Sequence, residues 1–280
     1  MTWGLALSAG SALGMANAGV IERLEEEGLR PNVIAASSMG AIVGAIYALG
    51  LPLSTYRELA PRVKMTNVVK PSERPFSGGL HGGLFRQRLE DHLAHIFRGA
   101  MIGDCTIPFL CVAGRVKAPI RWEKIVTRNF SRYVSSCIEE YVFPPSTPIL
   151  DAILASSAIP VVFSPVTIGG DTFVDICNFG AVPVRALRKH AHPDAVIATD
   201  TTPSFRTLTR FSPPFLRDWL RFNDENLLRD IRNADLVITP KPAASAFRFD
   251  KFDAFIRAGY KAADAAMPKV KALLQKSSRG

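Results

Sequence analysis

Cysteine and histidine, the usual residues of disulfide frameworks and zinc sites, are scarce in this sequence. Four of the 280 residues are cysteine, and their irregular spacing lacks the paired pattern of a zinc site. His92 and His95 have a spacing that permits metal ligation on a helix, but no acidic or histidine partner follows at a matching position. No calcium loop of the EF-hand type occurs. We therefore expect reduced thiols in a cytoplasmic protein, and no metal site.

Charged residues are absent from the first 21 positions. Ala16-Asn17-Ala18 resembles a signal-peptidase site, but no lysine or arginine precedes the apolar part, and glycine and serine interrupt it. A cleaved signal peptide is therefore not expected. A second uncharged run, residues 33–53, is long enough to span a bilayer. Its serines, small residues and Pro52 favour a buried strand, turn and helix instead.

Negative charge is in deficit, and the formal net charge is +9. Between Arg57 and Arg132, fourteen lysines and arginines stand against six acidic residues. A basic surface attracts anions such as phospholipid headgroups or nucleic acid, and a solvated basic face without a partner is an equally open interpretation. Because no nucleic-acid motif or interleaving of aromatic and basic residues occurs, we do not expect nucleic-acid binding.

Short apolar runs alternate with helical patterns along the chain. Strands are predicted at residues 3–8, 33–36, 107–113, 195–199 and 236–239, with a strand pair at 163–168 and 172–175 closed by Gly169-Gly170. Helices are predicted before Gly28, over 38–50 and 149–157, and from residue 252, and Phe85, Leu89 and Leu93 recur at helical spacing. Residues 62–83 predict a surface loop. Because the first strands are joined by a short helical crossover, they should be parallel. We predict one α/β domain over residues 1–280, with three layers and a largely parallel central sheet.

The most informative stretch is NVIAASSMGAIVGA, residues 32–45. A short apolar run stops at a cluster of small residues, and a helical apolar pattern starts at once. Nucleophile elbows have this pattern, because the turn between strand and helix is so tight that only small residues fit beside the serine. Ser38 is therefore a candidate nucleophile, and the Met39 N–H, one residue further on, is a candidate oxyanion donor.

Two further segments complete an ordered pattern with the elbow ASSMG (36–40). They are LALSAGSALGMANAGVIERLEEEGL (5–29) and ASSAIPVVFSPVTIGGDTFVDICNFGAVPV (155–184). Together the three segments resemble the patatin-like phospholipase family in its small bacterial form. Near the end of the chain, ADLVITPKP (234–242) and FDAFIRAGYKAA (252–263) look like the family's closing strand and helix. The resemblance covers most of the chain and implies a patatin-like fold.

The resemblance implies a serine–aspartate dyad in place of a triad. Ser38 matches the nucleophile, and Asp175 matches the base that takes its proton. The apolar neighbours Phe173, Val174 and Ile176 would partly bury the carboxylate and so strengthen it as a base. By itself Asp175 would be interpreted as a surface turn residue after a strand.

The loop at residues 9–14 matches the family's glycine-rich oxyanion segment. The backbone N–H groups of Gly10 and Ser11 would then hold the oxyanion, assisted by that of Met39. A phosphate loop is a competing interpretation, since Gly10 and Gly14 open a helix. The loop lacks the Lys-Ser/Thr of a P-loop, which disfavours that interpretation.

The implied activity is lipid acyl hydrolysis of the phospholipase A or lysophospholipase type, through an acyl-serine intermediate. The substrate would be a phospholipid or another acyl ester, and no metal or organic cofactor is needed. Such a protein would be cytoplasmic and peripheral at a membrane, where residues 64–85 or 211–222 would contact lipid through mixed aromatic and basic side chains. A serine esterase of small soluble esters is an alternative.

Several residues depart from the family pattern. The family usually has glycine, a basic residue or another small residue at the positions of Ser8, Ala9, Ser11, Leu13, Ala36, Ile176 and Cys177. Ser11 is costly if its position needs a positive φ, and bulk after Asp175 would shift the base or narrow the acyl pocket. A non-catalytic lipid-binding or regulatory protein on the same fold therefore stays open.

A histidine triad is a further alternative. His190 and His192 follow Asp175 in the order Ser…Asp…His. They lie in RALRKHAHP (185–193), which is typical of a helix end where cations complement the helix dipole and Pro193 stops the turn. We expect a structural role for both histidines.

Overall fold

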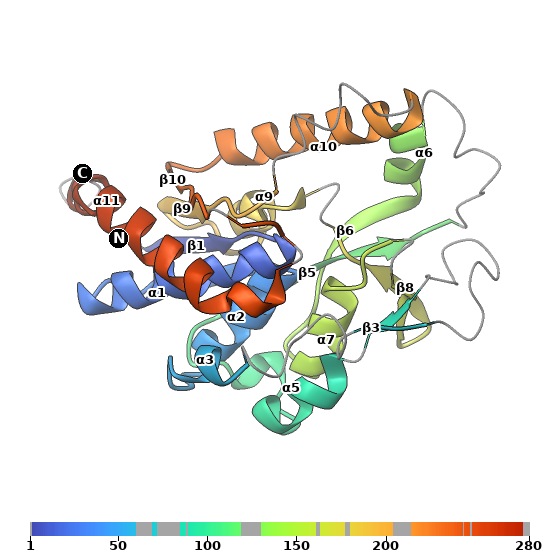
Figure 1. Ribbon diagram of the computed structural model, residues 1–280, viewed down its shortest axis with the longest axis horizontal. Coiled ribbons are helices and arrows are strands. Elements are labelled where there is room, and N and C mark those ends of the chain that lie inside the picture. Colours follow the sequence, from blue (N-terminus) through green and yellow to red (C-terminus); the bar gives the residue numbers. More distant parts are fainter. Residues whose placement is uncertain are drawn as a thin grey trace.

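A central sheet of eight strands organises the molecule (Figure 1). The computed structural model describes residues 2–59, 69–71, 85–87, 89–118, 130–160, 163–176, 180–203, 214–242, 244–246 and 248–276. The strands of the large sheet are β1 (Trp3–Leu7), β2 (Val33–Ser37), β5 (Phe109–Val116), β6 (Ile138–Val142), β7 (Val166–Ile168), β8 (Asp171–Val174), β9 (Ala195–Thr199) and β10 (Leu236–Ile238). A small antiparallel sheet holds β3 (Val69–Pro71) and β4 (Phe85–Gln87).

The large sheet is parallel over most of its width. Its strand order is β10-β9-β1-β2-β5-β8-β7, with β6 also on β5. The strands from β10 to β5 are parallel, whereas β6, β7 and β8 are antiparallel to their neighbours. Gly169 and Gly170, both with positive φ, close the β7–β8 hairpin. The largely parallel sheet predicted from the sequence is confirmed.

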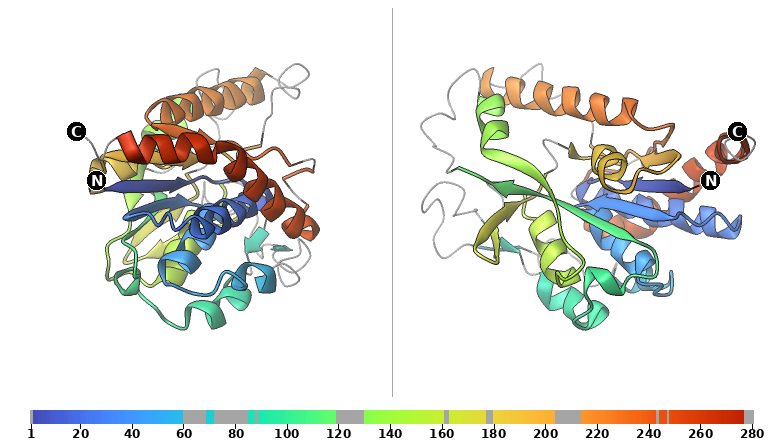
Figure 2. Two further views of the ribbon diagram at one scale, coloured as in Figure 1. Left: turned by 90° about the vertical axis from the view of Figure 1, so that its left-hand side faces the viewer. Right: turned by 180° about the vertical axis from the view of Figure 1, so that it is seen from behind.

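Helices cover both faces of this sheet. They are α1 (Ala16–Glu26), α2 (Met39–Ala48), α3 (Thr55–Leu59), α5 (Leu89–Phe97), α6 (Phe130–Cys137), α7 (Ile149–Ser156), α9 (Val184–Ala191), α10 (Pro214–Arg232) and α11 (Phe252–Lys276), with 3₁₀ turns η1 (Ser11–Met15), η3 (Ile102–Asp104) and η5 (Phe249–Lys251). Successive side chains of β1 point to opposite faces of the sheet. Leu5 and Leu7 pack in the core under α1, α2, α7 and α11. Ala6 packs in the core under α9 and α10. Figures 1 and 2 show these two helical layers on opposite faces of the sheet.

Two glycines bring α1 and α11 into backbone contact. A Cβ at Gly19 would lie 1.8 Å from the Ile256 carbonyl oxygen, and one at Gly259 would lie 1.8 Å from that of Ala16. Any side chain at either position would force the helices apart. This close crossing ties the C-terminal helix to the first helix of the chain.

Three sequence predictions need correction. The expected surface loop at residues 62–83 contains β3, and Phe85, assigned to a helical pattern, lies in β4 before α5 begins at Leu89. The strand predicted at 107–113 runs from Phe109 to Val116. The other residues of 62–83 lie outside the described ranges. β4 was misassigned because a strand of three residues, Phe-Arg-Gln, is too short to show a period of its own.

A charge cluster that includes one buried carboxylate lies at α10. The Arg185 Nε of α9 is 2.9 Å from Asp230 Oδ1 of α10, and its Nη2 is 3.4 Å from Glu140 Oε2 of β6. The Asp230 side chain is 1% exposed, and burial raises the pKa of its carboxyl to about 7. A Cβ at Gly180 would lie 3.5 Å from both Arg185 and Glu140, so the cluster adjoins the chain that follows Asp175.

The raised pKa of Asp230 predicts a stability that declines with pH. The folded state binds this proton more tightly than the unfolded state, so the carboxyl's contribution is complete below its unfolded pKa and is lost as the pH rises through about 7. We expect the free energy of unfolding, measured with urea, to fall between about pH 4 and about pH 7. The fall should shrink in Asp230→Asn and persist in Asp250→Asn, which removes an exposed carboxylate. An undiminished fall in Asp230→Asn would contradict the assignment.

Candidate active site

Ser38 forms a strained turn between β2 and α2. Its φ of 53° and ψ of −128° lie in a region that costs a non-glycine residue about 1–3 kcal/mol. The following helix starts in very close contact with the loop after β1. A Cβ at Gly40 would lie 2.5 Å from the Ser8 carbonyl oxygen, and one at Gly14 would lie 2.6 Å from Met39 Cβ. Small residues are therefore a steric requirement here, and Ser38 itself is 5% exposed.

Strand register brings the backbones of Ser38 and Asp175 to one place on β5. Val112 pairs with β2 and β6, and Gly114 pairs with β6 and β8. Because a strand has two edges, β2 and β8 must lie end to end on the same edge of β5. Their last residues, Ser37 and Val174, are opposite Val112 and Gly114, which are two residues or about 7 Å apart. Ser38 and Asp175, one residue further along each chain, both enter this gap beside Ala113.

The Ser156 hydroxyl takes the place of a backbone rung where β2 leaves β5. The Ile34 N–H donates to the Pro108 carbonyl at 2.9 Å, and continuing that ladder would pair the Ser38 N–H with the Val112 carbonyl. Instead the Ser38 N–H donates to Ser156 Oγ at 2.8 Å, and the Ser156 hydroxyl donates to the Val112 carbonyl at 2.7 Å. Both backbone groups stay satisfied while the chain turns into α2.

The end of α7 also holds the backbone of Asp175. Its N–H donates to the Ala158 carbonyl at 2.8 Å, two residues beyond Ser156. Asp175 is 0% exposed, and its neighbours Val174 and Ile176 are buried as well. The apolar surroundings predicted from the sequence are present, and Asp175 is not a surface turn residue. One short segment therefore fixes the backbone of both candidate dyad residues.

The N–H groups predicted to hold an oxyanion are not engaged elsewhere. Within the described part of the chain, the backbone N–H groups of Gly10, Ser11 and Met39 donate to no acceptor. The Ala9 N–H differs, because it donates to the Ala181 carbonyl at 2.8 Å. The three candidate donors lie on the two segments that pack together, η1 with its preceding loop and the N-terminus of α2.

A buried hydrogen-bond network fixes the loop that precedes η1. The Ser8 hydroxyl lies 2.9 Å from Thr201 Oγ1 and accepts the Thr201 N–H at 2.8 Å. The Ser8 N–H donates to Thr199 Oγ1 at 3.1 Å, and the Ser8 carbonyl accepts from Asn17 Nδ2 at 3.0 Å. The Thr199 hydroxyl donates to Asn17 Oδ1 at 2.6 Å. Ser8, a departure from the family pattern, is therefore fully bonded.

The other departures have different outcomes. Ser11 has a φ of 50°, so the strain anticipated for a non-glycine residue is present. Leu13 and Ile176 are buried in hydrophobic clusters, which is where an apolar replacement is stable. Cys177 lies outside the described residues.

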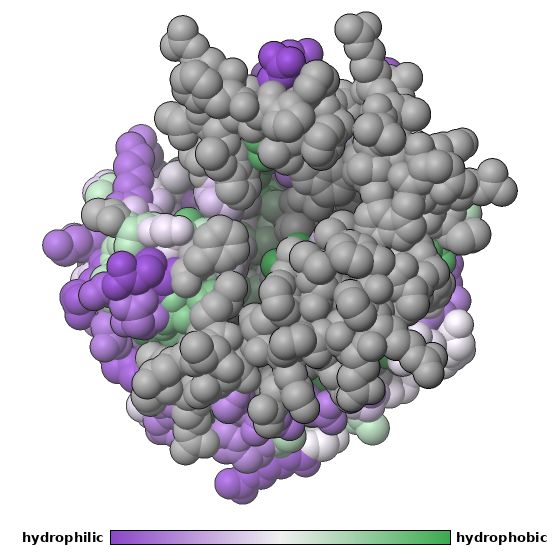
Figure 3. Space-filling model, turned by 45° about the vertical axis from the view of Figure 1, so that its right-hand side comes forward, coloured by the Kyte–Doolittle hydropathy of each residue, from purple (hydrophilic) through white to green (hydrophobic). Residues whose placement is uncertain are grey.

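The parallel strands end on the side that also carries the Ser38 turn. Figure 3 brings that side forward, where described hydrophobic residues are visible. The two histidines of the alternative triad lie elsewhere. His192 ends α9 with a φ of 49°, and the Asp194 N–H beyond it donates to the Thr2 carbonyl before β1 begins. His190 and His192 thus lie near the N-terminal end of β1, whereas Ser38 follows the C-terminal end of β2.

Other predicted features are less informative. No helix within the described ranges is both long and apolar enough to cross a bilayer. No three His, Cys, Asp or Glu side chains among the described residues could jointly hold a metal ion. Residues 64–85, predicted to contact lipid, lie almost wholly outside the described ranges. The second such segment, 211–222, enters α10, whose Leu220 is buried.

Ser156, Thr199 and Thr201 have roles that the sequence did not predict. The pair Ser156-Ser157 stands in a quoted family segment, but two adjacent serines carry no signal that tells a bridging hydroxyl from a passive one. The difference is clear in the structure, where the Ser157 hydroxyl is buried and has no hydrogen-bond partner among the described residues.

Ser156→Ala should destabilise the protein. It leaves the Ser38 N–H and the Val112 carbonyl without their bridging hydroxyl, at a cost of about 2 kcal/mol or more. Ser157→Ala removes the adjacent, buried and unbonded hydroxyl and should not lower the free energy of unfolding, because an unsatisfied buried hydroxyl is itself costly. Urea denaturation of both variants measures the difference, and equal effects would refute the bridging role.

Two substitutions to the family's usual glycine should have opposite effects. Ser11→Gly relieves a positive φ and should raise the free energy of unfolding by about 1 kcal/mol. Ser8→Gly removes the hydroxyl bonded to Thr201 and should lower it by about 1 kcal/mol or more. Thermal or urea denaturation gives both values, and a stabilised Ser8→Gly would show that the network contributes nothing.

Comparisons with known proteins show which family and fold this chain resembles. NTE family proteins of Mycobacterium bovis and Mycobacterium tuberculosis are 29% identical to this chain over 171 residues. The matched region is 61% of this chain and 41% of each relative. The match therefore spans less than half the length of these curated relatives. The crystal structure of VipD from Legionella pneumophila has a similar fold, with a TM-score of 0.51 and 12% identity over 96% of this chain and 67% of VipD.

The family model described as patatin-like phospholipase matches residues 5–175. That range starts in β1, ends at Asp175 and includes the Ser38 turn. It covers more than half of the 280 residues. The chain therefore belongs to the patatin-like phospholipase family.

Proposed function

We propose that this protein hydrolyses the acyl ester bonds of lipids, as a phospholipase A or lysophospholipase. One observation carries the proposal: the register of β5 directs a strained serine and a buried aspartate into the same gap from opposite directions. A buried carboxylate beside a hydroxyl is the arrangement that general-base activation of a serine requires. Family membership supports lipid esters as the substrate class.

In the proposed mechanism, Asp175 accepts the Ser38 hydroxyl proton as Oγ bonds to the acyl carbonyl carbon. The carbonyl electron pair moves onto oxygen and forms the tetrahedral oxyanion. When the pair returns, the bond to the alcohol oxygen breaks, and the leaving alcohol takes the proton from Asp175. Water then repeats the sequence on acyl-Ser38, giving its proton to Asp175, and the fatty acid leaves as Ser38 recovers its proton.

Backbone N–H groups supply the oxyanion site of this proposal. Gly10, Ser11 and Met39 are the candidate donors, because none of them is committed to another acceptor within the described residues. Such a donor is worth about 3 kcal/mol of transition-state stabilisation. The residues of this site need no metal or organic cofactor. We further propose that residues 1–280 form one domain, since α11 packs directly against α1.

Replacing either dyad residue should abolish turnover without unfolding the protein. Ser38→Ala removes the nucleophile, and Asp175→Asn removes the base, with an expected loss of at least a hundredfold, the usual scale of general-base catalysis. A lipid panel analysed by mass spectrometry measures the released fatty acid. The double variant His190→Ala/His192→Ala is the control and should retain its rate. Full activity in Asp175→Asn would exclude the dyad.

Labelling with a fluorophosphonate separates the competing functions. Labelled wild type with unlabelled Ser38→Ala supports a serine hydrolase, and rates on short against long acyl chains then separate a small-ester esterase from a lipid hydrolase. A wild-type protein that stays unlabelled supports the non-catalytic lipid-binding alternative, for which the strained Ser11 is the structural argument.

A further inference from the structure

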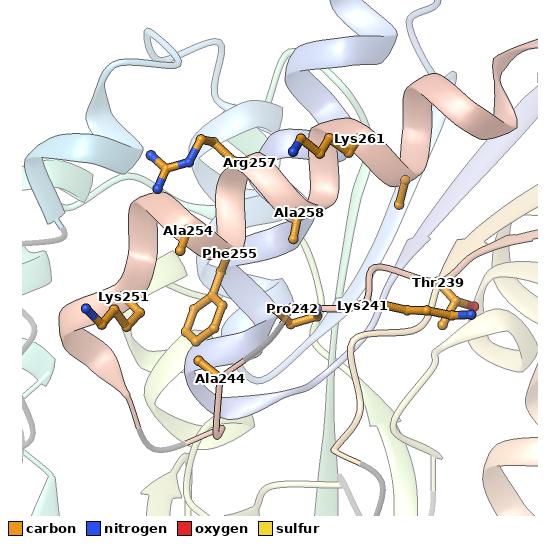
Figure 4. A pocket seen from close by; sticks show the side chains of 11 residues that line it. Thr239, Lys241, Pro242, Ala244, Lys251, Ala254, Phe255, Arg257, Ala258 and Lys261 are labelled. Carbon is orange, nitrogen blue, oxygen red and sulfur yellow. The ribbon is translucent and has the colours of Figure 1, made fainter.

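A groove lies between α11 and the chain that follows β10. Its cavity volume is about 620 Å³, and Thr239, Pro242 and Ala244 form one wall (Figure 4). Thr239 directly follows Ile238, the last residue of β10. Because β10 and β2 are parallel, the groove starts at the same C-terminal end of the sheet as the Ser38 turn. The strands β10 and β2 are three strand spacings, or about 14 Å, apart.

The floor of the groove is apolar. Ala254, Ala258 and Ala262 repeat every four residues along α11, and Phe255 lies beside them. Figure 4 shows Ala254, Phe255 and Ala258 on the side of α11 that faces the chain after β10. Because alanine is short, the space beside this stripe stays open. A cavity of this size and character suits part of an amphiphilic ligand.

Four cations and no described acidic side chain line the groove. The four cations are Lys241, Lys251, Arg257 and Lys261. Within the described part of the chain, Lys241, Arg257 and Lys261 form no ion pair, and Lys251 is 3.9 Å from Asp250.

Three cations near the groove are paired. Arg57 is 2.6 Å from Glu22, and Arg23 is 2.8 Å from Asp264 of α11 itself. Lys271, two turns beyond the groove on α11, pairs with Glu27. Arg257 and Lys261 also line an adjoining cavity with Glu22 and Glu26, but these two carboxylates pair with Arg23 and Arg57. Positive charge is thus left beside the open apolar floor.

We propose that this groove binds an acidic phospholipid of a bilayer surface, with the phosphate at the cations and the adjoining glycerol and acyl carbons on the alanine floor. The charge pattern selects an anion, and the apolar floor selects an anion that carries a hydrocarbon chain. The proposal deepens the proposed lipid hydrolysis and rests on it for the relevance of a membrane. It places the anchoring site on α11, apart from the Ser38 turn.

The groove and the candidate oxyanion loop are connected through the backbone. The Ala12 N–H of η1 donates to the carbonyl of Ala246, two residues beyond the groove wall, at 3.0 Å. A protein seated on lipid through the groove would therefore present the sheet edge that carries Ser38 to the same surface.

The test measures vesicle binding in the Ser38→Ala background, so that hydrolysis cannot alter the vesicles. Binding is compared on phosphatidylcholine vesicles with and without added phosphatidylglycerol at low salt. The triple variant Lys241→Gln/Arg257→Gln/Lys261→Gln should bind the acidic vesicles about a hundredfold more weakly, since each cation near an anionic surface contributes about a factor of five. Circular dichroism checks that the variants fold.

A matched triple variant controls for net charge. Lys189→Gln/Arg232→Gln/Lys269→Gln removes the same charge from exposed positions outside the groove and should reduce binding far less. Equal losses in the two triples would overturn the groove, as would equal binding to vesicles lacking phosphatidylglycerol. Because catalysis is absent from this assay, its failure is distinct from a failure of the dyad test.

A second variant tests the apolar floor. Ala258→Leu fills the groove without changing charge and should weaken binding to acidic vesicles by about tenfold if lipid carbons enter it. Unchanged binding would show that only surface charge attracts the vesicles and that lipid does not enter the groove, which would overturn the proposal. Displacement of the protein from vesicles by glycerol phosphate at micromolar concentration would identify a small-anion site and would also overturn the proposal.

Discussion

The candidate site depends on one hydroxyl group placed where two strands meet end to end. A backbone N–H and a carbonyl are both left over when β2 departs from β5, and both are buried. A group that satisfies them must accept on one side and donate on the other, which a serine hydroxyl does. Ser156 fits this position because the helix that carries it, α7, ends beside the junction. Two residues further on, Ala158 holds the backbone of Asp175. The strained turn at Ser38 and the approach of β8 are thus supported by the same few atoms.

Backbone strain at two serines is opposed by hydrogen bonds and close packing of the residues around them. Ser38 and Ser11 both have positive φ, which is costly for residues other than glycine. The surroundings that oppose this cost differ for the two. Ser38 is enclosed by the bridge at Ser156 and by the close approach of Gly40 to the loop after β1. The loop before Ser11 is held by the bonds between Ser8 and Thr201. The same network therefore compensates one departure from the family pattern and confines the strain of another.

Local sequence patterns predicted most of the fold, but they did not predict which distant strands pair with one another. The strands β1, β2, β9 and β10 were found because short buried strands between turn residues differ clearly from helices in period. β6 has no such contrast, since it follows α6 without a break and pairs with β5 some 25 residues earlier. For the site, the small residues around Ser38 were sufficient to predict a tight turn. Asp175 was identified by family resemblance, because one acidic residue after a strand has no distinctive local signal. Its burial follows from the β5–β8 register, which the sequence does not encode locally.

The composition of α11 links the fold to the proposed lipid groove. On one flank, Gly259 lets the helix touch the backbone of α1, so the helix position is fixed at van der Waals contact. On another, the alanine stripe at 254, 258 and 262 leaves space towards the chain after β10. Larger apolar residues there would gain burial energy by filling the groove, about 0.8 kcal/mol for each added CH₂. With alanine at these positions, the protein is therefore less stable than it would be with larger apolar residues there. The cations around the groove add mutual repulsion, and both costs are offset if an anion with an apolar tail occupies the groove.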